Sequence, residues 1–344
     1  MRFPFSLTRS MSGYLLKKKL AGQEKFPLVL MLEPLHACNL SCSGCGRIRE
    51  YAATSSKMMS IGECLDAIDE CGAPIVSICG GEPLIYPGID ELVAKTIERR
   101  KHVYLCTNGV QLVESVDRFK PTDRLFINVH LDGIDSTHDK MVNRRGVFAK
   151  ATAGIVAAKR AGFMVCTNTT IYAETSVQEV VSLFEHLNEL SVDGLLLSPA
   201  YGYESIHESE PNAAGEMFMD RDQIHERFRQ IRPLVNRFKL LTSPVYMDFL
   251  CGNRDLSCAA WANPTRNVCG WKGPCYLITD AHYSSYQELL ERTDWDKLSP
   301  IDDPRCENCL VHCGFEPAAV FAANRRIRDI FRMAIWQIGG SLST

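Results

Sequence analysis

The 344-residue chain lacks several features that would each assign it to a broad class of protein. It has no run of about 18 or more apolar residues, the length that a membrane-spanning helix needs. It has no internal repeat and no low-complexity segment. It also has no excess of positive charge, because 38 Lys and Arg residues are matched by 41 Asp and Glu residues. Without a basic surface to attract phosphates, we expect no nucleic-acid partner.

The N-terminal residues lack the order of a secretory signal peptide. Apolar side chains such as Phe3 and Leu15 precede the three lysines at 17–19, whereas a signal peptide places its charge first. The 15 cysteines are odd in number and several lie inside apolar runs, which does not fit a secreted disulfide framework. We therefore expect a cytoplasmic protein in which metal clusters use some of the thiols.

Apolar runs alternate with segments of helical period from residue 27 to about residue 200. The pattern predicts strands at 27–33, 74–79, 102–106, 124–131, 164–171 and 192–198, with helices at 59–72, 88–100, 110–119, 147–162 and 176–190 between them. Six strand–helix units predict a parallel sheet curled into a partial (β/α)6 barrel of the TIM type. Residues from 236 onward lose this rhythm. We expect an N-terminal basic and apolar segment (1–26), the barrel (27–235) and a cysteine-containing C-terminal domain (236–344).

Three cysteines follow the first predicted strand. Cys38, Cys42 and Cys45 have the spacing C-x3-C-x2-C on one short loop. Thiolates so placed can ligate three irons of a [4Fe–4S] cluster and leave the fourth iron open to a small molecule. The alternative is three ordinary buried thiols, since free cysteine is among the most buried residue types. The small residues and glycines of the loop favour the cluster.

A second motif, Gly80-Gly81-Glu82-Pro83, follows the second predicted strand. Together with the cysteine loop it resembles the radical S-adenosylmethionine (SAM) superfamily. That resemblance implies a [4Fe–4S] cluster on the cysteines, SAM on the open iron, and the methionyl amine held by the backbone of the loop with Gly80 and Gly81. Glycines allow such a close backbone approach. The carboxylate of Glu82 would add a negative charge near that amine. Gly44 departs from the family pattern, which places an aromatic residue beside the adenine, so that contact must come from elsewhere.

Three further polar residues lie where later predicted strands end. Asn108, His130 and Asp132 are candidate contacts to the ribose of SAM or to water in the site. The alternative for each is an ordinary hydrogen bond that satisfies a strand end.

A finer resemblance runs over nearly the whole chain, from about residue 12 to 320. It rests on segments 70–77, 104–108, 129–133, 248–253, 261–266, 270–275 and 306–313. These are similar to the adenosylhopene transferase family of hopanoid biosynthesis. The resemblance implies reductive cleavage of SAM and addition of the 5′-deoxyadenosyl radical to the terminal alkene of a hopene, diploptene, to give adenosylhopane. It also implies a hydrophobic triterpene substrate and a reductant protein such as flavodoxin or ferredoxin.

Addition of a radical to that alkene leaves a tertiary carbon radical, which needs a hydrogen atom. A cysteine S–H is the weakest common bond to hydrogen on a side chain, and Cys106 ends the third predicted strand. We therefore predict Cys106 as the catalytic hydrogen donor. Cys79 and Cys166 are alternatives near other strand ends, and Cys106 could instead be a packed strand thiol.

A triterpene needs an apolar, aromatic pocket. Tyr201, Tyr203, Tyr246 and Phe249 are candidates to line it, with ordinary core packing as the alternative.

The C-terminal region carries its own set of thiols: Cys258, Cys275, Cys306, Cys309 and Cys313. Their number and the spacing C-x2-C-x3-C are sufficient for an auxiliary Fe–S cluster or a structural zinc, with His312 as a substitute ligand. The pattern does not identify the metal. Four other cysteines are expected to be packing residues: Cys64, Cys71, Cys251 and Cys269.

Residues 317–338 carry one apolar stripe beside four arginines, Arg325, Arg326, Arg328 and Arg332, and predict a terminal amphipathic helix. Such a helix can lie on an anionic bilayer, which suggests peripheral contact with the inner face of the membrane. The alternative is a helix docked on the barrel with solvated arginines. Two other functions stay open: a radical SAM enzyme that abstracts hydrogen from another substrate, and a non-catalytic Fe–S scaffold or electron carrier.

Overall fold

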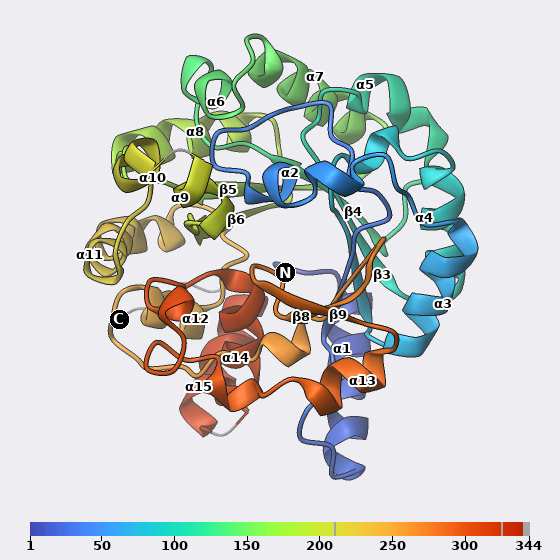
Figure 1. Cartoon of the computed structure of the whole chain (residues 1–344). Coiled ribbons are helices and arrows are strands. Elements are labelled where there is room, and N and C mark those ends of the chain that lie inside the picture. Colours follow the sequence, from blue (N-terminus) through green and yellow to red (C-terminus); the bar gives the residue numbers. More distant parts are fainter. Residues whose placement is uncertain (210, 325, 340–344) are drawn as a thin grey trace.

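The computed structural model describes residues 1–209, 211–324 and 326–339. Its centre is a nine-stranded sheet with the order β6-β5-β4-β3-β2-β1-β7-β8-β9. The first six strands are parallel and curl into a partial barrel (Figure 1). They are β1 (Val29–Leu32), β2 (Ile75–Ile78), β3 (His102–Thr107), β4 (Leu125–His130), β5 (Met164–Ile171) and β6 (Gly194–Pro199). Each lies within two residues of a predicted strand, so the predicted α/β partial barrel is confirmed.

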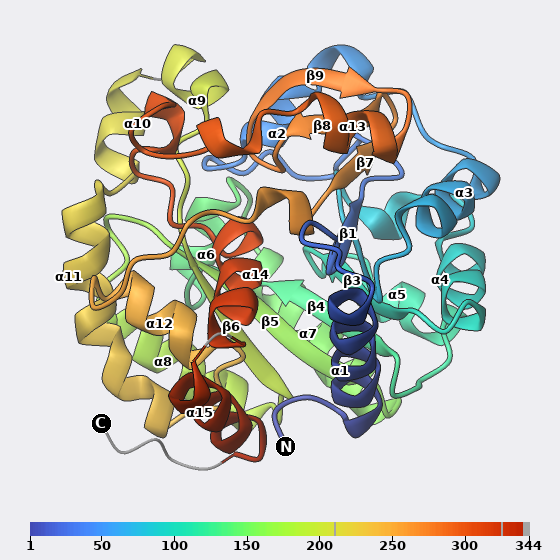
Figure 2. The same cartoon turned by 90° about the horizontal axis from the view of Figure 1, so that it is seen from below.

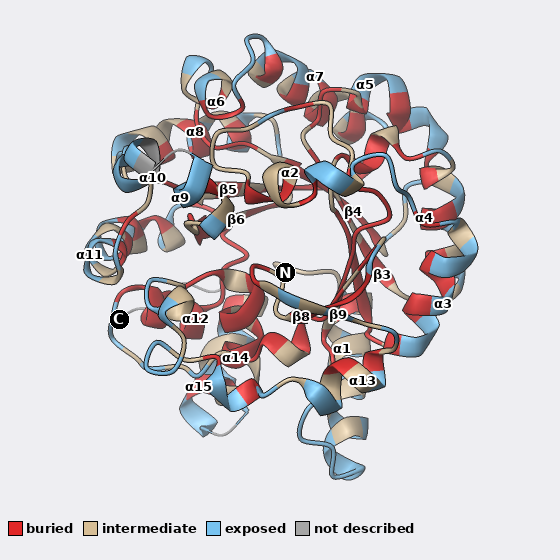
Figure 3. Ribbon diagram, in the orientation of Figure 1, coloured by how far each residue is buried: buried red, intermediate tan, exposed pale blue. Residues whose placement is uncertain are grey.

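Helices cover the outer face of this sheet. They are α3 (Ile61–Cys71), α4 (Ile89–Glu98), α5 (Leu112–Ser115), α7 (Val147–Arg160) and α8 (Val177–Glu189), which form an arc outside the strands in Figure 1. Ser60 and Glu63 form a capping box that begins α3, and Gly72 ends it in the left-handed conformation. The inner sides of the helices are buried and the outer sides exposed (Figure 3). The predicted helix at 110–119 is only one α-turn followed by a 3-10 turn.

The C-terminal region extends the same sheet. Strand β7 (Thr265–Asn267) pairs in parallel with β1, and β8 (Gly270–Pro274) and β9 (Thr279–Tyr283) continue from it in antiparallel fashion. On the β6 side, helices α11 (Arg221–Ile231), α12 (Pro244–Leu250) and α14 (His312–Ala323) occupy the opening of the barrel (Figure 2). One continuous hydrophobic core contains residues from both regions.

The N-terminal helix α1 (Phe5–Leu20) packs where the parallel strands begin. Leu7 is buried against Ile75, Phe126 and Cys166, so α1 closes the inner face of the barrel at the end opposite the cysteine loop. The remaining helices are α2 (Gly46–Glu50), α6 (Ser136–Met141), α9 (Glu204–Ser209), α10 (Pro211–Met217), α13 (Tyr286–Arg292) and α15 (Ile327–Gln337). None of the helices in the described part of the chain is both long and apolar enough to cross a membrane.

The single helix predicted at 317–338 is wrong, because α14 ends at Ala323 and α15 begins at Ile327. Arg326 has an extended backbone that separates the two. Arg325, which was predicted to lie on the helix, falls outside the described residues. Helix α15 docks through its polar face: Asp329 pairs with Arg254 at 2.7 Å and Arg332 pairs with Asp248 at 2.6 Å. Its apolar face therefore points outward.

Candidate active site

The cysteine loop (residues 36–46) lies at the carboxyl ends of β1 and β2, and Cys38, Cys42 and Cys45 on it are all partly exposed. The Leu40 N–H donates to Cys38 Sγ at 3.4 Å, and the Cys45 N–H donates to the Cys42 carbonyl at 3.2 Å. Apolar side chains, including Val110, pack against Cys38 and Cys42. The loop thus gathers three free thiols on one partly shielded surface.

The donor set fits a [4Fe–4S] cluster, since three cysteines on one loop are its characteristic ligands. Burial raises the pKa of Cys38 to about 11 and raises the pKa of Cys42 as well, so a metal has to displace the thiol protons. Among the side chains that the structure describes, no three His, Cys, Asp or Glu residues already stand in the geometry of a metal site. The three thiols must therefore turn toward a common centre when the cluster binds.

The glycine pair packs directly on the backbone that leads into the cysteine loop. The Gly81 N–H donates to the Leu35 carbonyl at 3.1 Å, and the Glu82 N–H donates to the Ala37 carbonyl at 2.9 Å. A Cβ on Gly81 would overlap the carbonyl oxygen of Ala37, and Gly80 has a φ of 106°, which favours glycine. Both glycines are thus required to hold the two loops together.

Glu82 is fully buried, and its carboxylate accepts three hydrogen bonds from the protein. The donors are the Thr107 hydroxyl (2.7 Å), the Asn108 N–H (2.8 Å) and the Leu84 N–H (3.0 Å). Burial raises the pKa of Glu82, although these donors lower it. A carboxylate has about four acceptor positions, so one is left for a ligand amine. Through its bonds with Thr107 and Asn108, Glu82 connects the loop after β2 to the end of β3.

The other predicted polar residues surround the same loop. Asn108 Nδ2 donates to Asn39 Oδ1 at 2.7 Å, which ties the β3 exit to the cysteine loop. His130 Nε2 and Asp132 Oδ2 lie 2.7 Å apart, and Asp132 also accepts the Thr170 N–H at 2.8 Å. Burial disfavours a charged imidazole, but the Asp132 carboxylate gives His130 a raised pKa overall. The side chain of His130 is one-third exposed, whereas that of Asp132 is buried, so His130 is the member of the pair that solvent or a ligand can reach.

Two tyrosines that the sequence patterns did not identify as cofactor contacts lie over the glycines of the cysteine loop. Tyr172 follows β5, and a Cβ added to Gly44 would lie only 2.9 Å from its ring carbon Cζ. Tyr203 follows β6, and a Cβ added to Gly46 would lie only 2.5 Å from the Cβ atom of this tyrosine. The aromatic residue that the family pattern places at position 44 is thus replaced in space by Tyr172, from another strand. Only the missing aromatic at position 44 hinted at this.

A buried ionic network connects the cysteine loop to the C-terminal strands, and it too was not predicted. Arg47 lies 3.5 Å from the fully buried Glu33 and hydrogen-bonds the Tyr51 hydroxyl at 2.7 Å. Its guanidinium also stacks on the Tyr276 ring, 3.9 Å from the ring centroid. Lys272 of β8, fully buried, pairs with Glu50 of α2 at 3.1 Å. The C-terminal strands therefore help to position the segment that follows Cys45.

Cys106 lies on the inner face of the sheet, away from the outer helices. Its thiol is 3.3 Å from the Ser77 hydroxyl and accepts from Asn128 Nδ2 at 3.5 Å. The Cys166 thiol donates to the other side of the same amide at 3.5 Å. Burial raises the pKa of Cys106, so the thiol keeps its hydrogen at neutral pH. Cys79 is buried, with Tyr276 as a hydrogen-bond partner.

The predicted pocket aromatics divide into two pairs. Tyr246 and Phe249 are buried in the core, where the Tyr246 hydroxyl donates to the Leu310 carbonyl at 2.6 Å. Tyr201 and Tyr203 are partly exposed and stack edge to face, with ring centroids 5.1 Å apart. Only the second pair is placed where a ligand could reach it.

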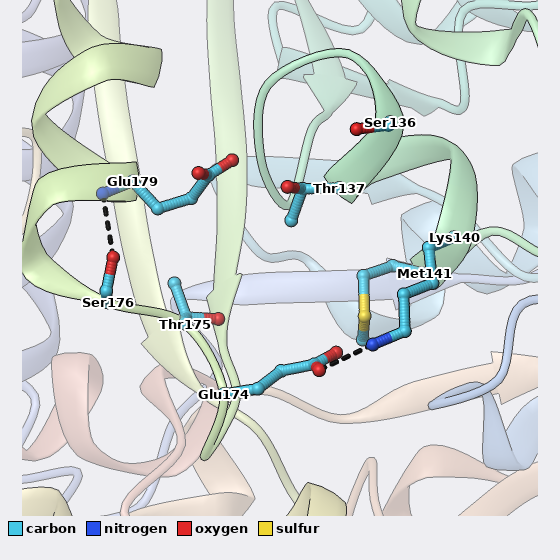
Figure 4. Close-up of a pocket in the computed structure, with 8 residues that line it drawn as sticks. All are labelled: Ser136, Thr137, Lys140, Met141, Glu174, Thr175, Ser176 and Glu179. Carbon is cyan, nitrogen blue, oxygen red and sulfur yellow. Dashed lines mark hydrogen bonds and ion pairs between the residues drawn. The ribbon is translucent and has the colours of Figure 1, made fainter.

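A polar cavity of about 340 Å³ lies between α6 and the β5–α8 connection (Figure 4). Lys140 and Glu174 pair across it at 2.6 Å. Met141 forms part of its wall, and the Met141 carbonyl accepts the Ser43 N–H of the cysteine loop at 2.9 Å. Its charged lining does not suit a hydrocarbon, so the cavity is not the predicted triterpene pocket.

The five C-terminal cysteines come together around one small cavity. Cys64, Cys71 and Cys251 are buried as predicted, but the prediction for Cys269 is wrong, because this residue is exposed in the turn between β7 and β8. His312 is not among the residues that line the cavity.

Two family models match the two halves of the chain separately. The family model of the radical SAM superfamily matches residues 32–187, and a domain of unknown function (DUF3463) matches residues 195–333. The AdoMet-dependent heme synthase of Methanosarcina barkeri is 30% identical over 169 residues, 48% of each chain. GTP 3′,8-cyclase 2 of Mycobacterium tuberculosis is 33% identical over 154 residues, 42% of this chain and 43% of the cyclase. The chain spans about half the length of these curated relatives.

Solved structures share the fold at low sequence identity. Streptococcus suis SuiB bound to its precursor peptide SuiA has a TM-score of 0.60 at 14% identity, over 87% of this chain and 74% of SuiB. The enzyme anSMEcpe with bound AdoMet has a TM-score of 0.56 at 15% identity, over 79% of this chain and 84% of the other. With three cysteines at the end of β1 and a glycine loop at the end of β2, residues 32–187 belong to the radical SAM superfamily, whose cofactors are a [4Fe–4S] cluster and SAM.

Proposed function

We propose that this protein is a radical SAM transferase that adds the 5′-deoxyadenosyl group to the terminal alkene of a hopene, with adenosylhopane as product. The placement of Cys106 is the observation that carries the proposal. Its protonated thiol lies inside the barrel, one strand from the Glu82 loop, where a substrate radical formed beside SAM would need a hydrogen atom. The heme synthase and GTP cyclase relatives are named for other substrates, so the hopene rests on the residue resemblance.

Cys38, Cys42 and Cys45 would hold the cluster. When bound, it would supply the electron, itself received from a protein of the flavodoxin or ferredoxin class, that splits SAM into methionine and the 5′-deoxyadenosyl radical. The 5′ carbon forms a bond to the terminal CH2 of the alkene, which leaves one unpaired electron on the tertiary carbon. Transfer of the hydrogen atom from the Cys106 S–H completes the product and leaves a thiyl radical. One further electron from the same class of reductant protein and one proton from solvent restore the thiol.

The test is an anaerobic incubation of the reconstituted enzyme with reductant, SAM and diploptene, read by mass spectrometry. We expect the Cys106→Ala variant to cleave SAM while it forms at least tenfold less adenosylhopane. Cys166→Ala, which changes the thiol on the other side of Asn128, is the matched control and should keep its product. In D2O the wild-type product should gain one deuterium, because thiols exchange with solvent. Wild-type product formation by Cys106→Ala would refute the role of this thiol.

The same incubation separates the two competing functions. An enzyme that abstracts hydrogen would release free 5′-deoxyadenosine and give no lipid adduct. A non-catalytic Fe–S scaffold or electron carrier would fail to bind SAM with its cluster intact. The Gly80–Gly81 backbone, packed on the loop that carries the cluster ligands, favours a SAM-binding enzyme over a carrier.

We further propose that the protein is cytoplasmic and contacts the inner face of the membrane through α15. Ile327 is 74% exposed and Phe331 is 65% exposed, on a helix whose charged face is held inward by two ion pairs. The N-terminal residues lie beside this helix (Figure 2), and the Arg2 N–H donates to the Gln337 carbonyl at 2.8 Å. Exposed Arg326 flanks the apolar face, so the surface suits an anionic bilayer.

Sedimentation with vesicles of anionic or neutral phospholipid tests this surface. We expect the wild-type chain to bind anionic vesicles and the Phe331→Ser/Ile335→Ser variant to bind them several-fold more weakly. Ile301→Ser is the matched control, because Ile301 is 93% exposed and lies outside α15. Equal binding by both variants, or no binding by the wild-type chain, would refute the proposal.

A further inference from the structure

Three separate segments bring the five C-terminal thiols together. Cys258 precedes α14 by more than fifty residues, Cys275 follows β8, and three cysteines occupy the turn and first residues of α14. All five line one cavity of about 30 Å³ with apolar side chains around them. That volume is enough for one water-sized occupant, about 10 to 15 Å³ being the minimum. The cavity thus brings five thiols to a largely apolar space of the size of a metal ion.

Backbone donors support three of these sulfurs. The N–H groups of Leu277 and Ile278 hydrogen-bond Cys275, the N–H of Val311 hydrogen-bonds Cys309, and the N–H of Gly314 hydrogen-bonds Cys313. The N–H two residues after Cys38 makes the same contact in the cluster loop, at 3.4 Å. Burial raises the pKa of these thiols, and the hydrogen bonds oppose this by favouring the anionic sulfur, which is the form that binds metals.

A glycine clears the space for the sulfur of Cys258. A Cβ on Gly314 would overlap Cys258 Sγ, and the Ala259 N–H donates to the Gly314 carbonyl at 3.1 Å. The segment with Cys258 is therefore pinned to the start of α14 with its thiol against the glycine. Cys313 precedes that glycine and is buried, whereas Cys306 is less deeply enclosed than the other four.

We propose that this cavity is a second metal centre, with Cys258, Cys275, Cys309 and Cys313 as ligands and Cys306 at its rim. Four thiolates select a zinc ion or an iron–sulfur cluster among the biological metals. Binding requires small rotations of the thiols, as in the first loop. The proposal does not depend on the hopene substrate, because it is tested by measuring the metal bound per chain.

The second centre would also stabilise the first. Tyr276, next to Cys275, accepts a hydrogen bond from Arg47 through its carbonyl and stacks under the same guanidinium. Arg47 lies two residues after Cys45. A metal that fixes Cys275 therefore fixes one wall of the site that holds the radical SAM cluster.

The first experiment measures metal in the full chain after anaerobic purification and reconstitution with iron, sulfide and zinc. The Cys38→Ala/Cys42→Ala/Cys45→Ala variant should retain one zinc or one iron–sulfur cluster per chain. Adding Cys275→Ala and Cys309→Ala should remove it, whereas adding Cys269→Ser, an exposed thiol, should not. A first triple variant without bound zinc or iron overturns the proposal.

The second experiment uses the unaltered chain, so that a folding defect cannot confuse the result. Thiol alkylation followed by peptide mass spectrometry is compared with and without a chelator. The four ligand cysteines should become reactive only after chelation, while Cys269 should react in both samples. Equal labelling of the four cysteines in the two samples overturns the proposal.

The Gly314→Ala variant tests the contact with Cys258. Its metal should be lost to the chelator on the order of tenfold faster, the usual scale for residues that support a ligand. Gly13→Ala is the matched control, because Gly13 is also helical and has no neighbouring atom within 4 Å of an added Cβ. Equal rates for the two variants would overturn the assignment of Cys258.

Discussion

The Gly81→Ala variant directly tests how the two loops of the site are held together. The new Cβ would overlap the carbonyl oxygen of Ala37 and lie 2.8 Å from the carbonyl oxygen of His36. Both neighbours are backbone atoms, so no side-chain rotation can relieve the clash. The glycine loop and the segment that leads to Cys38 must move apart.

The structure sets the size of the effect. Separation breaks the hydrogen bonds from Gly81 to Leu35 (3.1 Å) and from Glu82 to Ala37 (2.9 Å), each contributing about 1 kcal/mol. Overpacking adds about 1 to 3 kcal/mol. The expected loss in the free energy of unfolding is therefore about 3 to 5 kcal/mol, a large part of the roughly 5 to 15 kcal/mol of a typical domain.

Urea unfolding of the metal-free chain measures this loss, and iron content after reconstitution measures the effect on the cluster loop. Gly62→Ala is the control, because its added Cβ would meet only Ser60 Oγ at 3.8 Å on a helix. Alanine there should leave the stability unchanged or raise it by up to about 1 kcal/mol. If Gly81→Ala unfolds at the same urea concentration as Gly62→Ala and binds full iron, the packing argument is refuted.

Three further predictions concern buried charges. Arg47→Met should lower the unfolding free energy by about 3 to 5 kcal/mol, because Glu33 is left buried without its cation, and Arg47→Met/Glu33→Leu should recover most of that loss in urea unfolding. Burial lowers the pKa of Lys272 to about 8, whereas an unfolded lysine stays protonated to about pH 10.4. The unfolded state therefore binds more protons between these pH values. The free energy of unfolding of the wild-type chain, relative to that of Lys272→Met, should rise from pH 8 to pH 10 by about 3 kcal/mol at most. A difference between the two chains that does not change with pH contradicts this. Arg254→Ala should release α15 by breaking the pair with Asp329, seen as faster amide hydrogen exchange confined to α15.

Local patterns were sufficient to predict the six parallel strands. Each is a short apolar run between amphipathic helices, and a strand buried on both faces has that composition whatever its neighbours are. Strands β7 to β9 escaped prediction because they are short and contain buried polar residues. Lys272 and Asn267 are buried there because Glu50, at the end of α2, and Tyr51, which follows it, reach them.

The candidate site was predicted in the same partial way. The cysteine spacing and the glycine pair are local in sequence, so the loop that holds the three thiols could be located from the motif alone. The roles of Tyr172 and Tyr203 could not, because each fills the space over a glycine more than a hundred residues away. Glu82 was predicted to face a ligand amine, and three donors from the protein already bind it.

By itself, the sequence determined the strand–helix alternation, the three thiols after β1 and the glycines after β2, because period and spacing act over a few residues. Only the tertiary structure decided the rest. It gathered Cys258, Cys275 and Cys309 around one cavity, turned the apolar face of α15 outward and set Arg47 on Tyr276, 229 residues along the chain. Contacts of this kind depend on how distant segments pack, and no local pattern specifies the partner.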